Sequence, residues 1–269
     1  MAPPRVVVVC TALIALILEA ESLAAQDASS PLAYEIGRLN DFAAQVSWRL
    51  VHNEGTRTWV CRGEGSAVFL GRNHFLTADH VIDQNPITNE CAEFGTADPV
   101  IEFGSAQLQA TVSKSTPWVD ADGLTYRDGM DLALVEVDER MIPVDLRSLA
   151  PLVICDSDPP SSAHVWVATE YGVYAANTQT RTNDKFARID LAGRHGYSGG
   201  GVFDPERHCL AGIVSNGGPN GTNYVPNEAV RRFVTTSLAI SLSSTTVMPA
   251  PQRRESIGSS LSPAEPQAR

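Results

Sequence analysis

Short stretches of β-branched and aromatic residues recur along most of the chain, separated by clusters of Gly, Pro, Asn and Asp. They run from about residue 45 to about residue 217, and AQVSWRLV, DLALVEV and LAGIVSN are typical examples. Segments of this length and composition favour β-strands, and the clusters between them favour turns. About a dozen strands at such close spacing predict a barrel or sandwich protein rather than repeated βαβ units.

The hydrophobic pattern changes to a helical period late in the chain. In EAVRRFVTTSLAI, the residues Val230, Phe233, Val234 and Leu238 fall on one face of a helix. From there on Ser, Pro, Gln and Arg dominate, with too little apolar content to pack. We therefore expect residues 241–269 to form a disordered tail.

The first residues have the features of an export signal. Arg5 precedes an apolar run of 13 residues, and Ser22 and Ala24 provide small residues for cleavage. A retained membrane anchor is the alternative, but the run is short for a full span. We expect a cleavable signal peptide over residues 1–24 and a protein that is secreted or periplasmic.

Four cysteines remain after the predicted cleavage, namely Cys61, Cys91, Cys155 and Cys209. An even number in an exported chain predicts two disulfides, for which three pairings are possible. Proximity along the chain favours Cys61–Cys91 and Cys155–Cys209. The cysteines and histidines lack the spacing of a zinc site, so we expect no metal and no cofactor.

The charge balance limits the classes of partner. The chain carries 20 basic and 31 acidic side chains, for a net charge of −11, and it has no basic run. Because phosphates would be repelled, nucleic acid is not an expected partner. We expect no membrane partner once the signal is removed.

Three polar residues stand where serine-based acyl transfer needs them. FLTADHVI places His80 after a strand-like run, GMDLALVEV places Asp131 at the head of an apolar strand, and GYSGGGVF places Ser198 in a glycine loop. A serine nucleophile needs a base for its proton, an acid that orients the base, and main-chain donors for the oxyanion. These residues, in this order, predict a catalytic triad.

These motifs resemble those of the chymotrypsin-fold (trypsin-like) serine peptidases of the exported bacterial type. LTADHV is similar to the family's LTAAHC, DLALV to its DIALL, and GYSGGGVF to its GDSGGPLV. LAGIVSNG resembles the strand that lines the substrate cleft, and NYVPNEAVRRFV resembles the closing strand and helix. The resemblance implies an all-β fold of two six-stranded antiparallel barrels with a C-terminal helix. It places the first barrel in residues 34–140 and the second barrel with the helix in 145–240. A shift in composition around residues 139–151 indicates a linker between the two units.

The resemblance also implies a role for each motif residue. His80 would act as general base and then as general acid, Asp131 would orient it, and Ser198 would be the nucleophile. The backbone amides of Gly196 and Ser198 would form the oxyanion hole. Asp128 is the rival for the acid, and the match of DLAL to the family favours Asp131.

The same resemblance points to four residues that would contact the substrate. Ala192 would form the floor of the primary specificity pocket, where it offers no carboxylate to a basic side chain. Ser215 would lie beside the catalytic aspartate, Asn216 would narrow the pocket, and Gly217 would keep it open. We therefore expect specificity for small or medium apolar side chains rather than for Arg or Lys.

Tyr197 departs from the family pattern at the position before the nucleophile. Pancreatic-type members have an aspartate there, which pairs with a new α-amino group after cleavage, and a phenol cannot neutralise an ammonium at neutral pH. Glu35 precedes the Ile36-Gly pair, so a tryptic cut is also missing. We expect an enzyme that is not activated by N-terminal insertion. The other departures are Asp79, which would add a charge beside the histidine or bond to backbone, and Gly201.

The expected function is that of a secreted serine endopeptidase that acts on protein or peptide substrates as a monomer. An acidic side chain in the substrate is an alternative preference because Arg194 and His195 are close to the loop, although Val214 stands where a glutamate-specific enzyme would have histidine. The competing function is a catalytically inactive binding module on the same fold, which the unusual residues Tyr197 and Gly201 favour.

Overall fold

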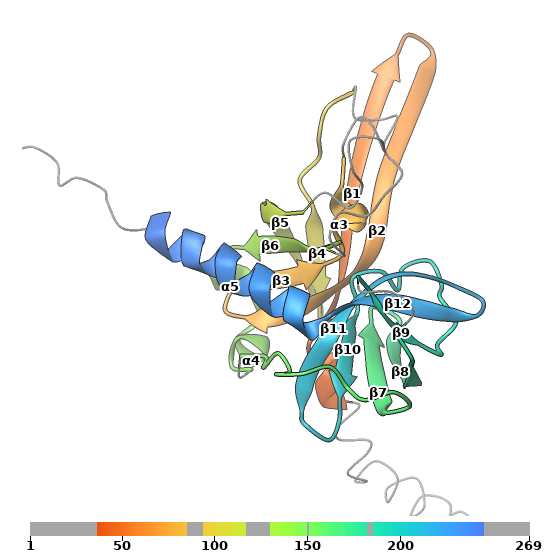
Figure 1. Cartoon of the computed structure of the whole chain (residues 1–269). Coiled ribbons are helices and arrows are strands. Elements are labelled where there is room, and N and C mark those ends of the chain that lie inside the picture. The colour runs from red at the N-terminus through yellow and green to blue at the C-terminus, as the bar shows by residue number, and fades with distance from the viewer. Residues whose placement is uncertain (1–36, 85–93, 117–129, 150, 182–184, 245–269) are drawn as a thin grey trace, which may run out of the picture.

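The chain forms two closed barrels, each built from six antiparallel strands (Figure 1). The computed structural model describes residues 37–84, 94–116, 130–149, 151–181 and 185–244, with side chains up to residue 238. The predicted all-β class with two six-stranded barrels is confirmed. The first barrel has the strand order β1-β2-β3-β6-β5-β4 and consists of β1 (Ala43–Glu54), β2 (Arg57–Gly71), β3 (His74–Thr77), β4 (Val100–Phe103), β5 (Ala106–Ser115) and β6 (Ala133–Val137).

The second barrel follows in sequence and repeats the closed arrangement. Its strand order is β10-β11-β12-β9-β8-β7. The strands are β7 (His164–Thr169), β8 (Gly172–Gln179), β9 (Ala187–Ile189), β10 (Gly201–Asp204), β11 (Cys209–Gly218) and β12 (Gly221–Pro226). Between the barrels the chain forms the short helices η2 (Glu139–Met141) and α4 (Val144–Arg147).

Alternation of buried and exposed residues builds the barrel interiors. In β1, every second residue from Ala44 to Trp48 is buried, as expected for a strand with one face on the core. Three phenylalanines from neighbouring strands meet in the first barrel, with ring centroids 4.9 to 5.1 Å apart. They are Phe69, Phe75 and Phe103, and all are almost fully buried. Tilted and edge-on aromatic contacts of this kind stabilise the core beyond the effect of burying apolar area.

The hairpin of β1 and β2 projects beyond its barrel (Figure 1). The strands pair without interruption from Ala43↔Val68 to Glu54↔Arg57. Gly55 has a φ of 59° in the two-residue connection, which fits the type II′ turn that joins twisted strands. The outer half of β2 is exposed and its inner half is buried, so only the inner half belongs to the core.

One of the two predicted disulfides is present. Cys155 and Cys209 are bonded with an S–S distance of 2.05 Å, which confirms that pairing. The bond holds the chain between the barrels against β11, where Ile154 and Leu210 also form a parallel bridge. Cys91 lies outside the described residues, so the Cys61–Cys91 pairing stays a prediction.

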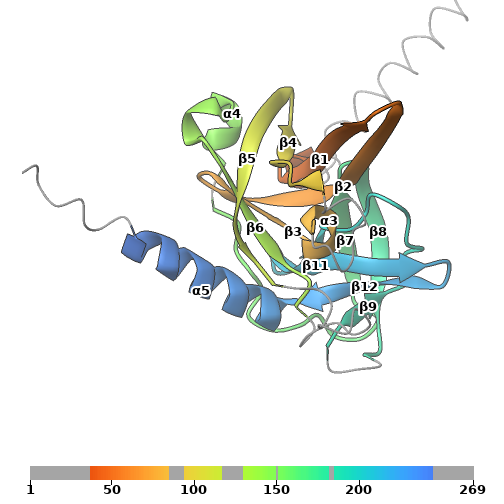
Figure 2. The ribbon, with the colours of Figure 1, turned by 90° about the horizontal axis from the view of Figure 1, so that it is seen from above.

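The C-terminal helix α5 (Asn227–Ser244) follows β12 directly and extends away from the barrels (Figure 2). Val230, Phe233 and Val234 are buried in the main core, which confirms the predicted apolar face. The helix continues four residues beyond residue 240, because no Pro or Gly occurs there to end it. The signal peptide predicted over 1–24 and the rest of the predicted tail lie outside the described residues. None of the helices in the described part of the chain is long and apolar enough to cross a membrane.

Candidate active site

His80 and Asp131 of the first barrel form a hydrogen-bonded pair. His80 lies on α3 (Asp79–Ile82), a short helix that follows β3, and Asp131 precedes β6. The Asp131 carboxylate accepts hydrogen bonds from the His80 backbone N–H at 3.0 Å and from the ring Nδ1 at 2.7 Å. Because an ionised carboxylate only accepts, the shared proton is carried by Nδ1, which leaves Nε2 as the basic nitrogen of the neutral ring.

The Asp131 carboxylate stays ionised despite complete burial. Burial alone would raise the pKa of Asp131, but hydrogen bonds from His80 and Ser215, together with the attraction to the His80 ring, hold it below its ordinary value. The Ser215 hydroxyl donates to Asp131 Oδ2 at 2.6 Å. An acceptor with this many donors is suited to stabilise an imidazolium next to it.

Ser215 also connects this pair to Ser198 from the second barrel. The Ser198 hydroxyl donates to the Ser215 carbonyl at 2.7 Å. A chain of hydrogen bonds therefore runs from His80 through Asp131 and Ser215 to Ser198. The fold thus brings His80, Asp131 and Ser198 together where the barrels meet, although His80 and Ser198 are 118 positions apart in the sequence. Asp128 lies outside the described residues.

The loop before Ser198 is a tight turn that leaves two amides available. Tyr197 N donates to Arg194 O at 3.2 Å. Gly196 has a φ of 88° and His195 does not have a positive φ, which is the pattern of a type II turn. The N–H groups of Gly196 and Ser198 make no hydrogen bond within the described part of the chain. Two N–H groups without partners, two residues apart on one tight turn, are what an oxyanion hole needs.

Tyr197 is buried under this loop among other tyrosines. Its side chain is 3% exposed. Its ring centroid lies 5.0 Å from that of Tyr174 and 6.3 Å from that of Tyr171. Burial and the hydrogen bond with Tyr174 raise the pKa of Tyr197 to about 12, so the phenol is neutral at physiological pH. The space beneath the loop is thus filled by aromatic packing and not by an ion pair at this residue.

A family model described as a trypsin-like peptidase domain matches residues 65–213, more than half of the chain. The chain belongs to the trypsin-like peptidase family. Among solved structures it is similar to that of Rv3671c from M. tuberculosis H37Rv, described as the inactive form of a serine-to-alanine mutant. That match has a TM-score of 0.51 and 15% identity, covers 76% of this chain and 90% of the other, and supports the chymotrypsin-like fold. Comparison with curated protein sequences found no match.

In this trypsin-like peptidase, the residues predicted to contact substrate lie on two facing segments. The Gly193 N–H donates to Gly218 O at 2.9 Å. A Cβ added to Gly193 would lie 2.7 Å from the Gly217 Cα, so the two segments touch there. The Asn216 side-chain oxygen on β11 accepts a hydrogen bond from the Asn223 side chain on β12 at 2.8 Å. Ala192 is exposed beside Gly193.

Glu170 lies against the turn at Gly196, and it is located at the connection between β7 and β8. A Cβ on Gly196 would lie 2.7 Å from Glu170 Oε1 and 2.8 Å from the Tyr171 hydroxyl. Glu170 Oε1 is buried with no hydrogen-bond partner among the described residues. Burial, and then the charges of Glu64 and Glu102, raise the pKa of Glu170 to about 7.

This shift predicts a pH-dependent loss of stability. The pKa of Glu170 rises from 4.5 to about 7 on folding, so the folded protein favours the protonated carboxyl. The contribution of the protonated Glu170 carboxyl to the free energy of unfolding is fully present below about pH 4.5 and is lost as the pH rises through about 7. We expect Glu170→Gln to flatten the decline in the free energy of unfolding over this range, measured by urea denaturation at several pH values. Glu139→Gln, an exposed control, should follow the wild type, and a parallel decline in Glu170→Gln would contradict the assignment.

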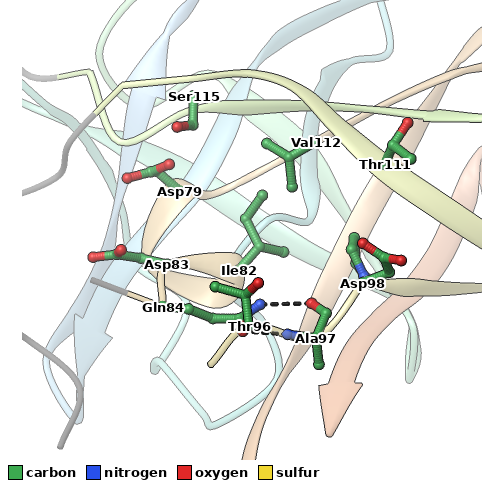
Figure 3. Close-up of a pocket in the computed structure, with 11 residues that line it drawn as sticks. Asp79, Ile82, Asp83, Gln84, Thr96, Ala97, Asp98, Thr111, Val112 and Ser115 are labelled. Atoms are coloured by element: carbon green, nitrogen blue, oxygen red, sulfur yellow. Dashed lines mark hydrogen bonds between the residues drawn. The ribbon is translucent and has the colours of Figure 1, made fainter. Parts of the chain in front are cut away.

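Asp79 lines a hollow of about 480 Å³ beside α3 (Figure 3). The hollow also contains Asp83 and Asp98, and the side chains of Ile82 and Val112 lie between these carboxylates. Asp79 itself is 3% exposed. The aspartate that replaces the family's alanine therefore belongs to the hollow between α3, β5 and the segment 96–99.

The sequence reading missed two hydroxyl residues of the first barrel that contact the nucleophile loop. Ser66 N donates to Ser198 O at 2.8 Å, and Thr77 Oγ1 donates to Ser66 O at 2.7 Å. A Cβ on Gly199 would lie 1.9 Å from Ser66 O, so this close approach requires glycine. The one sign of them in the sequence is that Ser66 and Thr77 interrupt the apolar positions of two strands with hydroxyl side chains.

Proposed function

We propose that this trypsin-like peptidase is a serine endopeptidase that hydrolyses peptide bonds through an acyl-enzyme. The observation that carries the proposal is the chain of hydrogen bonds from His80 through Asp131 and Ser215 to Ser198. It stands beside a turn whose amides at Gly196 and Ser198 are free of partners within the described residues.

Each residue has a defined task in the proposed mechanism. The Ser198 hydroxyl rotates from Ser215 O toward His80 Nε2, gives up its proton there and attacks the substrate carbonyl carbon. The resulting oxyanion accepts hydrogen bonds from the amides of Gly196 and Ser198. His80 passes the proton to the leaving amine, and the acyl-enzyme remains. A water molecule then gives a proton to His80 and releases the acid, and Ser198 regains its proton.

Asp131 supports two states of His80 in this cycle. Before the attack it holds the ring with the proton on Nδ1, through the 2.7 Å bond to Oδ2. After the proton transfer it lies next to the imidazolium as a fully buried counter-charge. Because the surroundings have a low dielectric constant, this attraction is worth more than it would be in water.

The proposed enzyme needs no N-terminal cut for activation. Tyr197, which stands at the position of the activating aspartate, is neutral, and its ring packs against that of Tyr174. Aromatic burial can order the loop in the absence of a new ammonium group. The contact of Gly193 with the strand at Gly217 favours substrates with a small apolar side chain before the cleaved bond.

The proposed setting follows from the predicted signal peptide and the disulfide. We place the enzyme outside the cytoplasm, as a monomer that acts on protein or peptide substrates. The Cys155–Cys209 bond supports an oxidising compartment.

Reaction with a fluorophosphonate probe tests the proposal. Protein that starts at Ala25 should be labelled without trimming, and mass spectrometry should locate the label on Ser198. Protein that starts at Ile36 serves as the trimmed comparison. Labelling of the trimmed form alone would overturn the activation proposal, and folded protein that resists the probe in both forms would overturn the enzymatic function in favour of an inactive binding module.

A further inference from the structure

Ser66 on β2 is a buried side chain that joins the two barrels at the oxyanion-hole turn. It has no exposed surface. Its hydroxyl donates to Gly196 O at 2.7 Å, a residue 130 positions further along the chain. The same hydroxyl oxygen accepts from the backbone N–H of Glu170 at 3.0 Å. One hydroxyl of the first barrel therefore bonds to two backbone groups of the second, a buried carbonyl and a partly buried N–H.

The backbone of Ser66 holds the other side of the same loop. Its N–H donates to Ser198 O at 2.8 Å. The two bonds from Ser66 thus reach Gly196 and Ser198, the residues whose amides face the proposed oxyanion. The peptide between Gly196 and Tyr197 is fixed at both ends, since its carbonyl accepts from Ser66 and its N–H donates to Arg194 O.

Contacts on the far side of Gly196 complete this arrangement. The Tyr171 ring and the Glu170 carboxylate occupy the space where a Cβ of Gly196 would lie. Because the Glu170 N–H is itself bonded to the Ser66 hydroxyl, this hydroxyl holds the 170–171 turn and the Gly196 carbonyl at a fixed separation. Loss of the hydroxyl would free both at once.

From these contacts we infer that Ser66 is a positioning residue for the oxyanion hole, acting through its side-chain hydroxyl on the Gly196 carbonyl. The inference rests on the proposed function. Ser66 touches no reacting atom; it keeps the amide of Gly196 aimed at the same point as the amide of Ser198. Such alignment matters most in the transition state, because the charge on the oxygen develops only there.

The test compares Ser66→Ala with the wild type and with Ser237→Ala. Ser237 is a matched control, because it is a buried serine whose hydroxyl bonds to Phe233 O within α5. We expect Ser66→Ala to lower kcat per labelled active site about 10- to 100-fold, as misplacement of an oxyanion donor does, with little change in KM. Affinity for a peptide aldehyde, whose adduct with Ser198 carries an oxyanion, should fall by the same factor. Ser237→Ala should leave both values unchanged.

A second variant keeps the inference testable if Ser66→Ala does not fold. Ser66→Cys retains a side chain of similar shape with a weaker donor, and it should give a smaller loss in kcat of the same kind. A purely structural role would lower the fraction of labelled protein and leave kcat per labelled site unchanged, which would overturn the inference. Wild-type protein that neither reacts with the probe nor cleaves peptides would overturn the proposed function as well.

Discussion

Replacement of Ser198 by alanine is expected to lower kcat about 10⁶-fold, because no other group can form the acyl-enzyme. The residual rate should still exceed that in water, by about 10³- to 10⁴-fold, since the oxyanion amides and substrate binding remain. KM should change little. The fold should tolerate the change, because the lost hydrogen bond is to Ser215 O in a partly exposed position and such bonds contribute about 1 kcal/mol.

The measurement is the hydrolysis of a peptide ester or amide with a small apolar side chain, followed by mass spectrometry. Ser148→Ala is the matched control, because Ser148 is an exposed serine directly after α4 whose hydroxyl bonds to Val144 O. It should retain full activity. A loss of less than about 100-fold in Ser198→Ala would mean that the observed hydrolysis has another nucleophile, since an essential serine gives far larger losses.

Asp131→Asn is expected to lower kcat about 10⁴-fold through the wrong tautomer of His80. All three groups that face the carboxylate are donors, namely the backbone N–H and Nδ1–H of His80 and the hydroxyl of Ser215. An asparagine offers one oxygen and one NH₂ group, so it must place a donor against one of them. If the NH₂ group faces Nδ1, the ring proton moves to Nε2 and the base toward Ser198 is lost.

Two measurements separate this effect from a loss of folding. Nitrogen NMR of His80 should report the proton on Nδ1 in the wild type and on Nε2 in Asp131→Asn. Asp138→Asn, which changes an exposed aspartate paired with Arg140 at 2.6 Å, should leave kcat unchanged. A folded Asp131→Asn protein with the wild-type tautomer and activity within tenfold of wild type would contradict the role assigned to Asp131.

Local patterns in the sequence predicted a barrel or sandwich protein and the apolar face of α5, and proximity along the chain favoured the Cys155–Cys209 bond. The two six-stranded barrels followed only from the resemblance to a known family. The strand signals are strong because alternation and turn residues agree over short distances, as in β1. The motifs around His80, Asp131 and Ser198 were visible for a similar reason, since each lies within a few residues of glycine or apolar neighbours that match a known family.

Contacts between distant residues were beyond the same reasoning. The Ser66 hydroxyl and Gly196 carbonyl meet only because two barrels pack together, and no spacing in the sequence encodes that. Tyr197 could be recognised as unable to bind an ammonium group, but its packing on Tyr174 required the folded second barrel. The raised pKa of Glu170 depends on burial and on Glu64 and Glu102 from two strands of the other barrel.

The projecting hairpin of β1 and β2 has a consequence for how molecules of this protein meet. Within the described residues, β1 pairs with β4 only at Gln45–Ser47 and β2 pairs with β3 only from Val68 onward. In the described part of the chain no further strand pairs with the outer ribbon, and unpaired strand edges are templates for aggregation between identical chains. Arg49 and Arg62 stand opposite each other on this ribbon, and Arg57 lies at its tip. Charged side chains on an edge strand oppose such pairing with another copy.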